Sequence, residues 1–259
     1  MNVALVTGAS SGIGLAISGE LARLGYPLLM VSNEEEPLTR AAAAIHGEHG
    51  VAALPLCMDL AQPDSARRLF DYCAANNLTV TVLVNNAGMF FFKDIIDTPP
   101  ERVETMINLH VVTPALLCRL FAPQMAAEGG YILNMASIAA RMVFPGITLY
   151  SATKSFLHVF SRAMHHELVE RGLSITAVCP GAAATGLYNL PPRYIQLGVR
   201  LGIIMPTERL ARLALRKMFQ RKAEFIPGGL INRLFIFAVS FMPARMIRYI
   251  RKKLLVLQK

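Results

Sequence analysis

The stretch T-G-A-S-S-G-I-G, Thr7 to Gly14, follows a short apolar run and leads directly into an amphipathic segment. Its three glycines permit a tight turn, a close approach of the main chain to a ligand, and close packing of the next helix on a sheet. Amide groups at the start of that helix would face an anion such as a pyrophosphate. The stretch therefore predicts a strand, a dinucleotide-binding turn and a helix, and a purely structural turn is the alternative.

Short apolar runs alternate with longer amphipathic stretches along the chain, as expected where crossover helices join parallel strands. Continuous apolarity suits strands that are covered on both faces. Since no linker or repeat divides the sequence, we predict a single α/β domain over 1–259: a doubly wound, Rossmann-type parallel sheet of about seven strands with helices on both faces. The expected strands are 3–6, 28–31, 51–57, 80–84, 131–135, 174–179 and 224–227, and the expected helices are 13–24, 35–47, 62–76, 100–127, 148–171 and 207–221.

Composition narrows the class of protein. Hydrophobic residues make up 54% of the 259 residues, enough for a sizeable core. The four cysteines have no C-x-x-C spacing, which favours reduced core residues over disulfides or a metal site. The start M-N-V-A-L-V-T-G has no basic region ahead of its apolar run. It predicts a first strand rather than a signal peptide, and hence a cytoplasmic protein.

The net charge of +9 is concentrated near the C-terminus, since residues 193–259 hold 15 Lys or Arg and 2 Asp or Glu. No nucleic-acid partner is expected, because neither interleaved aromatic residues nor a known nucleic-acid module accompanies these charges. Within the C-terminal extension 228–259, Met246, Ile247, Ile250, Leu254 and Leu257 recur at helical spacing, with cations largely between them. This basic amphipathic pattern predicts either peripheral contact with an anionic membrane or docking on protein.

Tyr150 and Lys154 stand four residues apart in Y-S-A-T-K, inside an expected helix. That spacing puts both side chains on one face, one turn apart. A free phenol is mostly protonated near neutral pH, and a neighbouring ammonium favours the phenolate. The pair therefore suits a general acid/base with its electrostatic partner, whereas each residue alone is explained as well by packing or solvation.

The form T-G-x-x-x-G-I-G resembles the classical short-chain dehydrogenase/reductase family, and the resemblance extends in order over residues 1–185. C-M-D-L, N-N-A-G, M-I-N-L, N-M-A-S, Y-S-A-T-K and P-G-A-A-A-T follow one another as in that family, with Ser137 thirteen residues before Tyr150. The resemblance implies the catalytic residues Asn108, Ser137, Tyr150 and Lys154. It implies the cofactor-binding residues Gly8, Ser10, Ser11, Gly12, Ile13, Gly14, Asn33, Asp59, Leu60, Asn86, Ala87, Gly88, Tyr150, Lys154, Pro180, Gly181, Ala183 and Thr185.

The resemblance also implies a reaction, the transfer of hydride between NAD(P)(H) and a secondary hydroxyl or ketone. Tyr150 would act as acid/base, Ser137 would donate to the substrate oxygen, and Lys154 would also hold the nicotinamide ribose. Asn108 would lie at a helix irregularity and anchor a water relay to Lys154. Asp59 has a second interpretation, as a helix N-cap. The alternative for the whole chain is a non-catalytic dinucleotide-binding regulatory or scaffold protein on the same fold.

The choice of cofactor depends on the end of the second expected strand. An acid there would bind the ribose 2′-OH of NAD, and an arginine would accept the 2′-phosphate of NADP. Asn33, in S-N-E, does neither, although Glu34 to Glu36 disfavour a phosphate unless they serve the first turn of the next helix. NADP(H) is favoured because the NAD-type aspartate is missing, and NAD(H) remains the alternative.

Residues 186–206 correspond to the segment that folds over the substrate in the resembled family. The apolar character of this lid predicts a lipophilic substrate, steroid-like or fatty acyl, and packing of the lid on the core is the alternative. The family also implies a homodimer or homotetramer through the helices at 100–127 and 148–171. No metal is expected. The candidate substrate-pocket residues are Phe90, Met142, Phe144, Leu187 and Tyr188.

Overall fold

A computed structural model describes residues 1–184, 192–201, 204–228, 243 and 245–247. Its centre is a seven-stranded sheet in the order β3-β2-β1-β4-β5-β6-β7, in which every neighbouring pair is parallel. The predicted doubly wound sheet is confirmed. The strands are β1 Asn2–Thr7, β2 Leu28–Ser32, β3 Ala53–Cys57, β4 Thr79–Asn85, β5 Tyr131–Met135, β6 Ser174–Val178 and β7 Glu224–Phe225.

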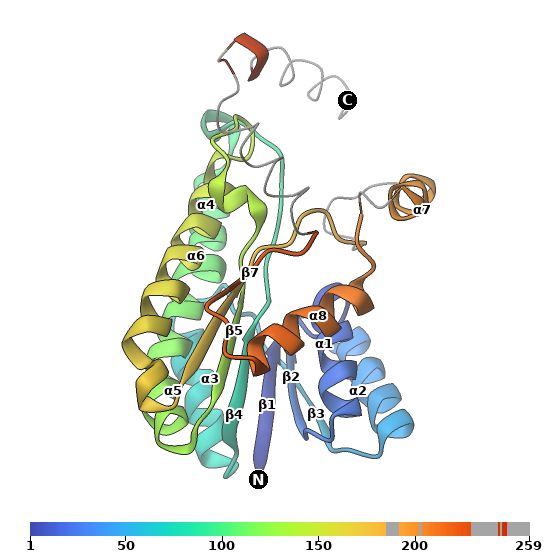
Figure 1. Cartoon of the computed structure of the whole chain (residues 1–259), viewed down its shortest axis with the longest axis vertical. Coiled ribbons are helices and arrows are strands. Elements are labelled where there is room, and N and C mark those ends of the chain that lie inside the picture. Colours follow the sequence, from blue (N-terminus) through green and yellow to red (C-terminus); the bar gives the residue numbers. More distant parts are fainter. Residues whose placement is uncertain (185–191, 202–203, 229–242, 244, 248–259) are drawn as a thin grey trace.

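Helices cover both faces of the sheet (Figure 1). One layer consists of α1 Gly12–Arg23, α2 Glu35–His49 and α8 Thr207–Phe219, and the other of α3 Ser65–Ala75, α4 Pro100–Ile107, α5 Thr113–Glu128 and α6 Thr148–Leu168. Strand β1 serves both layers, because alternate side chains point to opposite faces. Ala4 and Val6 belong to the core under α1, α2 and α8, whereas Val3 and Leu5 belong to the core under α3 and α5.

The helix expected at 100–127 is divided. Between α4 and α5 the chain forms a π-helical turn, η2, over Asn108–Val112. Such insertions widen a helix locally and are frequent at functional sites. The run Pro100–Glu128 is also long and apolar enough to cross a membrane, but Leu117 and Phe121 are buried against the sheet. We therefore interpret it as a helix of the core.

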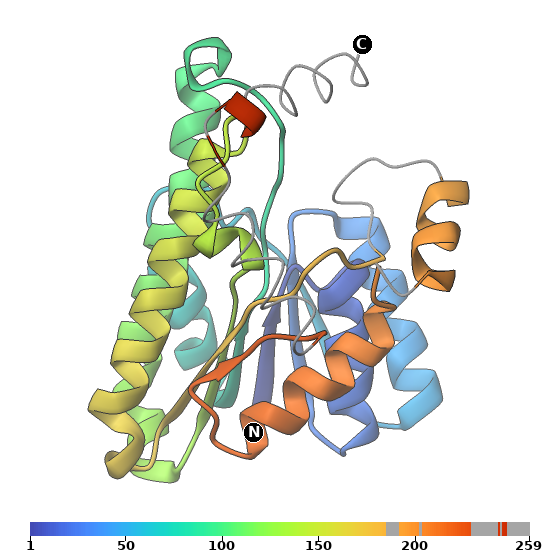
Figure 2. The same ribbon diagram turned by 45° about the horizontal axis from the view of Figure 1, so that its top comes forward.

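One helix lies where only a lid was expected. Helix α7, Pro192–Arg200, stands away from the sheet and its two helical layers (Figures 1 and 2). The rest of the predicted lid, 186–191 and 202–203, lies outside the described residues, apart from the segment 204–206 that leads into α8. Of the predicted extension 228–259, only 228, 243 and 245–247 are described. The expected amphipathic tail therefore stays a prediction.

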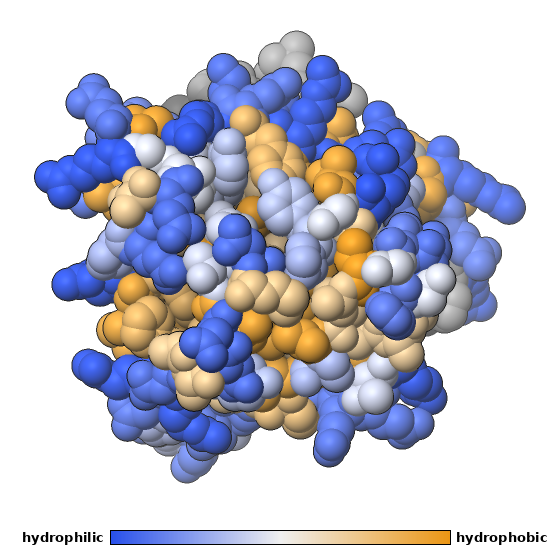
Figure 3. Space-filling view, turned by 90° about the horizontal axis from the view of Figure 1, so that it is seen from below, coloured by the Kyte–Doolittle hydropathy of each residue, from blue (hydrophilic) through white to orange (hydrophobic). Residues whose placement is uncertain are grey.

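The topology decides where a ligand can enter. Because all strands are parallel, their carboxyl ends meet at one edge of the sheet. The chain leaves β1 toward β2 on one side, and it leaves β4 toward β5 on the other, so a crevice opens between these two strand ends. The opposite end of the molecule, seen from below, is a mixture of hydrophilic and hydrophobic side chains (Figure 3).

Candidate functional site

A cleft of about 530 Å³ opens at this crevice between β1 and β4. Its size falls in the range of small-molecule and cofactor sites. One end is lined by Asn33, Glu34 and Asp59, the middle by the glycine turn, and the other end by Tyr150 and Lys154. The cleft therefore joins segments that lie far apart in the sequence. The predicted residues in its wall are Gly8, Ser10, Ser11, Gly12, Ile13, Asn33, Asp59, Leu60, Asn86, Ala87, Gly88, Ser137, Tyr150, Lys154, Pro180, Gly181 and Ala183.

The glycine turn between β1 and α1 has the conformation that a phosphate site needs. Gly8 and Gly12 have φ of 64° and 55°, the left-handed region that favours glycine. A Cβ on Gly14 would lie 2.0 Å from the carbonyl oxygen of Gly8, so only glycine fits at this position. Gly14 itself does not line the cleft. The amides at the start of α1 border the cleft, which suits a pyrophosphate. These residues fit a dinucleotide.

Hydrogen bonds hold the loop after β4 against this turn. Thr7 Oγ1 accepts from the amides of Asn86, at 2.9 Å, and Ala87, at 3.0 Å. Asn86 Nδ2 donates to the carbonyl oxygen of Thr7 at 3.0 Å. The side chain of Asn86 therefore fixes the floor of the cleft rather than reaching into it.

A chain of polar side chains closes the end of the cleft near β2. Ser32 Oγ donates to Ser10 Oγ at 2.9 Å, and Ser10 Oγ donates to Glu34 Oε2 at 2.9 Å. Asn33 also lines the cleft, but the acidic group there belongs to Glu34. The sequence analysis weighed both Asn33 and the acids at 34–36 in the choice of cofactor, and the structure shows that Glu34 is the one of these acids that lines the cleft.

Asp59 lies in the cleft wall and also stabilises its own turn. Its carboxylate accepts from the Ala61 amide at 3.0 Å and from Gln62 Nε2 at 2.9 Å. The residue at the N-cap of α3 is Asp64 instead. The interpretation of Asp59 as the cap of that helix is therefore wrong.

Helix α6 brings Tyr150 and Lys154 to the far end of the cleft, both buried at 6% and 5% exposure. Lys154 Nζ lies 5.8 Å from the centroid of the Tyr150 ring and donates to the carbonyl oxygen of Met135 at 2.9 Å. Burial lowers the pKa of Lys154 from 10.5 to about 8, because a charged amine loses its hydration there. Ser137, after β5, accepts from the Ala139 amide at 3.1 Å and keeps its own O–H for donation.

The remaining predicted residues are less close to the cleft. Asn108 begins η2, as the resemblance implied, but it is not among the described residues of the cleft wall, whereas Leu109 and His110 are. Phe90 packs edge-on against Tyr150, with ring centroids 5.0 Å apart. Met142 and Phe144 are half-buried and lie outside the cleft wall. Thr185, Leu187 and Tyr188 lie outside the described residues.

Sequence reasoning missed several residues of the cleft wall. Most of them adjoin a predicted residue, often at a strand end. Their position in the sequence indicates that they lie near the cleft, but it does not show which of them line it. His110 had a clearer signal, since it is the single histidine of the expected helix 100–127 and lies two residues after Asn108. The missed wall residues are Ser32, Met58, Ala61, Met89, Thr105, Leu109, His110, Met135 and Ala136.

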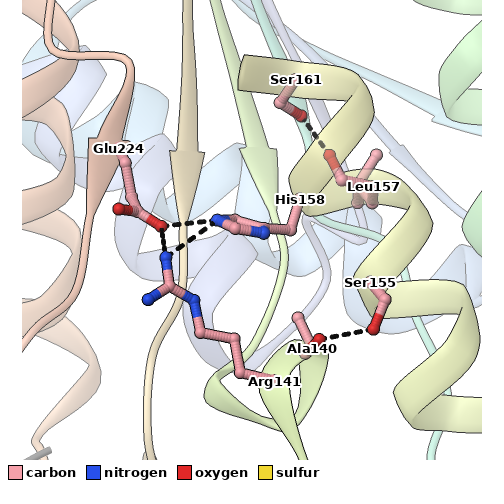
Figure 4. Close-up of polar contacts among 7 residues, drawn as sticks. All are labelled: Ala140, Arg141, Ser155, Leu157, His158, Ser161 and Glu224. Atoms are coloured by element: carbon pink, nitrogen blue, oxygen red, sulfur yellow. Dashed lines mark hydrogen bonds and ion pairs between the residues drawn. The ribbon is translucent and has the colours of Figure 1, made fainter. Parts of the chain in front are cut away.

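A charged network supports the turn that follows Ser137 (Figure 4). The short helix η3, Ile138–Arg141, ends at Arg141, whose guanidinium donates to Glu224 Oε1 on β7. His158 Nε2, on α6, donates to the same oxygen. Ser155 Oγ donates to the carbonyl oxygen of Ala140. The bond from His158, with Arg141 nearby, lowers the pKa of Glu224 to about 2 despite its burial.

Three side chains of this region have the donor types of a metal centre. Ligand atoms of His158, Cys179 and Glu224 lie within 4.8 Å of one another. The guanidinium of Arg141 already neutralises the carboxylate, however. His158 Nε2 is occupied as well, since it donates to Glu224 Oε1. The cluster is better explained as an ion pair that supports the turn after Ser137.

Comparisons with known proteins agree with this geometry. The family model described as "short chain dehydrogenase" matches residues 2–190. "Very-long-chain 3-oxoacyl-CoA reductase-B" of Danio rerio is 30% identical over 96% of this chain and 83% of its own length. The chain covers only 61% of the length of "Very-long-chain 3-oxoacyl-CoA reductase" of Mus musculus and of Homo sapiens.

Solved structures give the same result. A short-chain dehydrogenase from Sphingobium yanoikuyae in complex with NADPH has a TM-score of 0.80 and 27% identity, over 94% of this chain and 97% of that one. A 7β-hydroxysteroid dehydrogenase has a TM-score of 0.84 and 26% identity, over 96% of both chains. Together with the cleft, the glycine turn and the family match, these likenesses establish that the chain belongs to the short-chain dehydrogenases, a family of NAD(P)-dependent oxidoreductases.

Proposed function

We propose that this protein is an NADP(H)-dependent reductase that interconverts a ketone and a secondary hydroxyl on a lipophilic substrate, with 3-oxoacyl thioesters as the first class to test. The convergence of Ser137, Tyr150 and Lys154 at one end of a dinucleotide-sized cleft carries the proposal. The substrate class follows from the similarity to 3-oxoacyl-CoA reductases. Steroid-like ketones are the second class, because a hydroxysteroid dehydrogenase has a similar fold.

The cofactor would lie along the cleft, with its pyrophosphate at the start of α1 and its nicotinamide near Tyr150. When bound, the nicotinamide supplies or accepts the hydride. The chain's own residues then handle the proton. In the reductive direction the Tyr150 phenol donates a proton to the carbonyl oxygen, and in the oxidative direction it removes the hydroxyl proton.

Lys154 has two tasks in this proposal. As an ammonium near the Tyr150 ring it favours the charged form of the phenol, and its three N–H donors suit the ribose hydroxyls. Ser137 would donate to the same substrate oxygen and stabilise charge as it develops. Ser137 suits this because the Ala139 amide occupies one of its lone pairs and leaves its O–H for the substrate.

The choice of NADP(H) rests on the NADPH-bound relative and on the missing aspartate at position 33. Glu34 works against it, since a carboxylate beside Ser10 repels a 2′-phosphate. The proposal therefore includes an outward rotation of Glu34, which is an exposed side chain, when NADP(H) binds.

A homodimer or homotetramer is also proposed, through α5 and α6. On α6, Val159 is 64% exposed and Phe156 39%, and Phe156 stacks on Phe160 with centroids 5.5 Å apart. Val112, which ends η2 just before α5, is 41% exposed. Such apolar side chains on adjoining helices suit burial against a second copy. Light scattering of the wild type and of Val159→Glu tests this, and a wild-type monomer would contradict it. Cytoplasmic location stays a prediction. Membrane contact through 228–259 also stays a prediction, because most of that segment lies outside the described residues.

The deciding experiment follows NADPH and NADH oxidation at 340 nm with a panel of 3-oxoacyl thioesters, steroid ketones and small polar ketones. We expect turnover with NADPH and a long-chain 3-oxoacyl thioester or a steroid ketone, and far less with short polar ketones. Cofactor binding without turnover on any ketone would favour the alternative, a dinucleotide-binding regulatory protein. Turnover restricted to polar ketones would reject the lipophilic class.

A further inference from the structure

His110 is a buried titratable side chain of the cleft wall that the proposed mechanism does not use. It is 1% exposed, and η2 turns it toward the loop after β4 and toward α6. Its ring lies at a steep angle to the Tyr150 ring, with centroids 5.8 Å apart. A Cβ on Gly88 would lie 3.1 Å from His110 Nε2 and 3.6 Å from Lys154 Nζ. The imidazole therefore adjoins both members of the proposed catalytic pair.

The partners of the two ring nitrogens fix its tautomer. The Met89 amide donates to Nε2 at 2.9 Å, so Nε2 carries no proton. Thr153 Oγ1 donates its own proton to the carbonyl oxygen of Tyr150 at 2.9 Å. It must therefore accept from His110 Nδ1, which lies 3.1 Å away. The contact at Nε2 requires the neutral form with its proton on Nδ1, and the contact at Nδ1 is consistent with that tautomer.

Three oriented hydrogen bonds thus join two walls of the cleft. One end is Met89, next to Gly88 in the loop after β4, and the other is the main chain of Tyr150 in the first turn of α6. The middle of the chain is buried, since Thr153 is 3% exposed. Removing a member would leave a buried partner without its hydrogen bond, which disfavours this arrangement. Burial and the charge of Lys154 also hold the pKa of His110 well below its usual range, so the ring stays neutral near pH 7.

We propose that His110 is a positioning residue for Tyr150. Through Thr153 it fixes the first turn of α6 relative to the Gly88–Met89 loop, and so sets the distance between the phenol and the reacting carbon. Displacements of about 1 Å at such a site lower rates strongly. The inference rests on the proposed reductase activity, and it adds a residue that contacts neither the substrate nor the cofactor in that proposal.

The test uses the full chain and compares Thr153→Val with Thr153→Ser. Valine matches threonine in shape but lacks the hydroxyl, whereas serine keeps the hydroxyl. We expect Thr153→Val and His110→Ala each to lower kcat about tenfold, the effect of roughly 1.4 kcal/mol on the barrier. Thr153→Ser should stay near the wild type, and the double variant should fall no further than either single one. The Kd for NADPH, measured by fluorescence, should change less than about twofold, because the glycine turn is untouched.

Equal losses in the Val and Ser variants, additive losses in the double variant, or a Kd that weakens in step with kcat would each overturn the proposal. A second readout does not need turnover. Amide hydrogen exchange at 149–154 should speed up about tenfold in Thr153→Val and not in Thr153→Ser. If that pattern holds while the wild type reduces no ketone, the proposed function fails and the structural link stands. If exchange is unchanged in Thr153→Val, the link itself is rejected.

Discussion

Lys154 Nζ lies 5.8 Å from the centroid of the Tyr150 ring, one helical turn away on α6, and it is anchored to the carbonyl oxygen of Met135. This hydrogen bond connects the end of β5 with the helix that carries the pair. The ammonium is buried, so its charge is screened by little water and acts strongly on its neighbours.

Tyr150→Phe should lower kcat by about 10² to 10⁴, because it removes the proposed proton donor and acceptor while the ring still fills its place. NADPH binding, measured by fluorescence, should persist, since the glycine turn remains intact. Tyr26→Phe, which removes the hydroxyl of a ring stacked on Phe219 outside the cleft wall, is the matched control. Turnover of Tyr150→Phe close to that of the wild type would reject the acid/base role.

Lys154→Met should lose turnover and cofactor affinity but gain stability near pH 7. The pKa of Lys154 is about 8 in the folded protein, against an ordinary value of 10.5. Burying the charged amine therefore opposes folding below pH 8, and this cost fades as the pH rises from about 8 to 10.5. Urea unfolding at pH 7 and pH 10 should show the advantage of the variant shrinking. An advantage that grows with pH would contradict the assigned direction.

Glu34→Gln should tighten NADP(H) binding by roughly threefold to tenfold, because it removes a carboxylate from the neighbourhood of the 2′-phosphate. Asn33→Asp should act in the opposite sense and shift preference toward NAD(H). Glu35→Gln, in the first turn of α2, is the matched control for charge. Titration of each variant with both cofactors measures the ratio of the Kd for NADPH to the Kd for NADH. The same ratio in every variant would show that neither position 33 nor position 34 selects the cofactor.

Gly14→Ala should abolish cofactor binding and destabilise the protein, since its Cβ would lie 2.0 Å from the carbonyl oxygen of Gly8. Gly19→Ala lies in the same helix, and a Cβ there meets nothing within 4 Å. The free energy of unfolding of Gly19→Ala should rise by up to about 1 kcal/mol, as expected when alanine replaces a helical glycine. Thermal unfolding with and without NADPH compares the two. Similar behaviour would mean that the turn adapts to a side chain.

Glu224→Gln should lower the free energy of unfolding by about 1–3 kcal/mol at neutral pH. The folded-state pKa of Glu224 is about 2, below its ordinary 4.5, so its contribution is complete above pH 4.5 and disappears as the pH falls toward 2. The stability difference between wild type and variant should therefore narrow below pH 4.5. Glu36→Gln, with an 81% exposed side chain, serves as the control. A stability difference between wild type and Glu224→Gln that stays constant from pH 7 to pH 3 would show that the ionised Glu224 carboxylate does not stabilise the fold.

The alternation of strands and helices could be predicted because its signals are local. Apolar runs and their spacing lie within a few residues of one another, and so do the glycines of the turn. The same is true of Tyr150 and Lys154, whose shared helix face follows from helical geometry. The helix irregularity at Asn108, which the structure shows as a π-helical turn, was expected only from the family resemblance, since no periodicity in 100–127 indicates it.

The sequence by itself thus determined the parallel sheet, the glycine turn and the pairing of a phenol with an amine on one helix. Only the tertiary structure decided which distant groups meet. Glu34 reaches Ser10 across 24 residues, His110 reaches Thr153 across 43, and Arg141 reaches Glu224 across 83. Such contacts depend on the order of strands in the sheet and on which helix covers which face. No local pattern encodes them, because loop closure over tens of residues leaves many partners equally accessible until the core has packed.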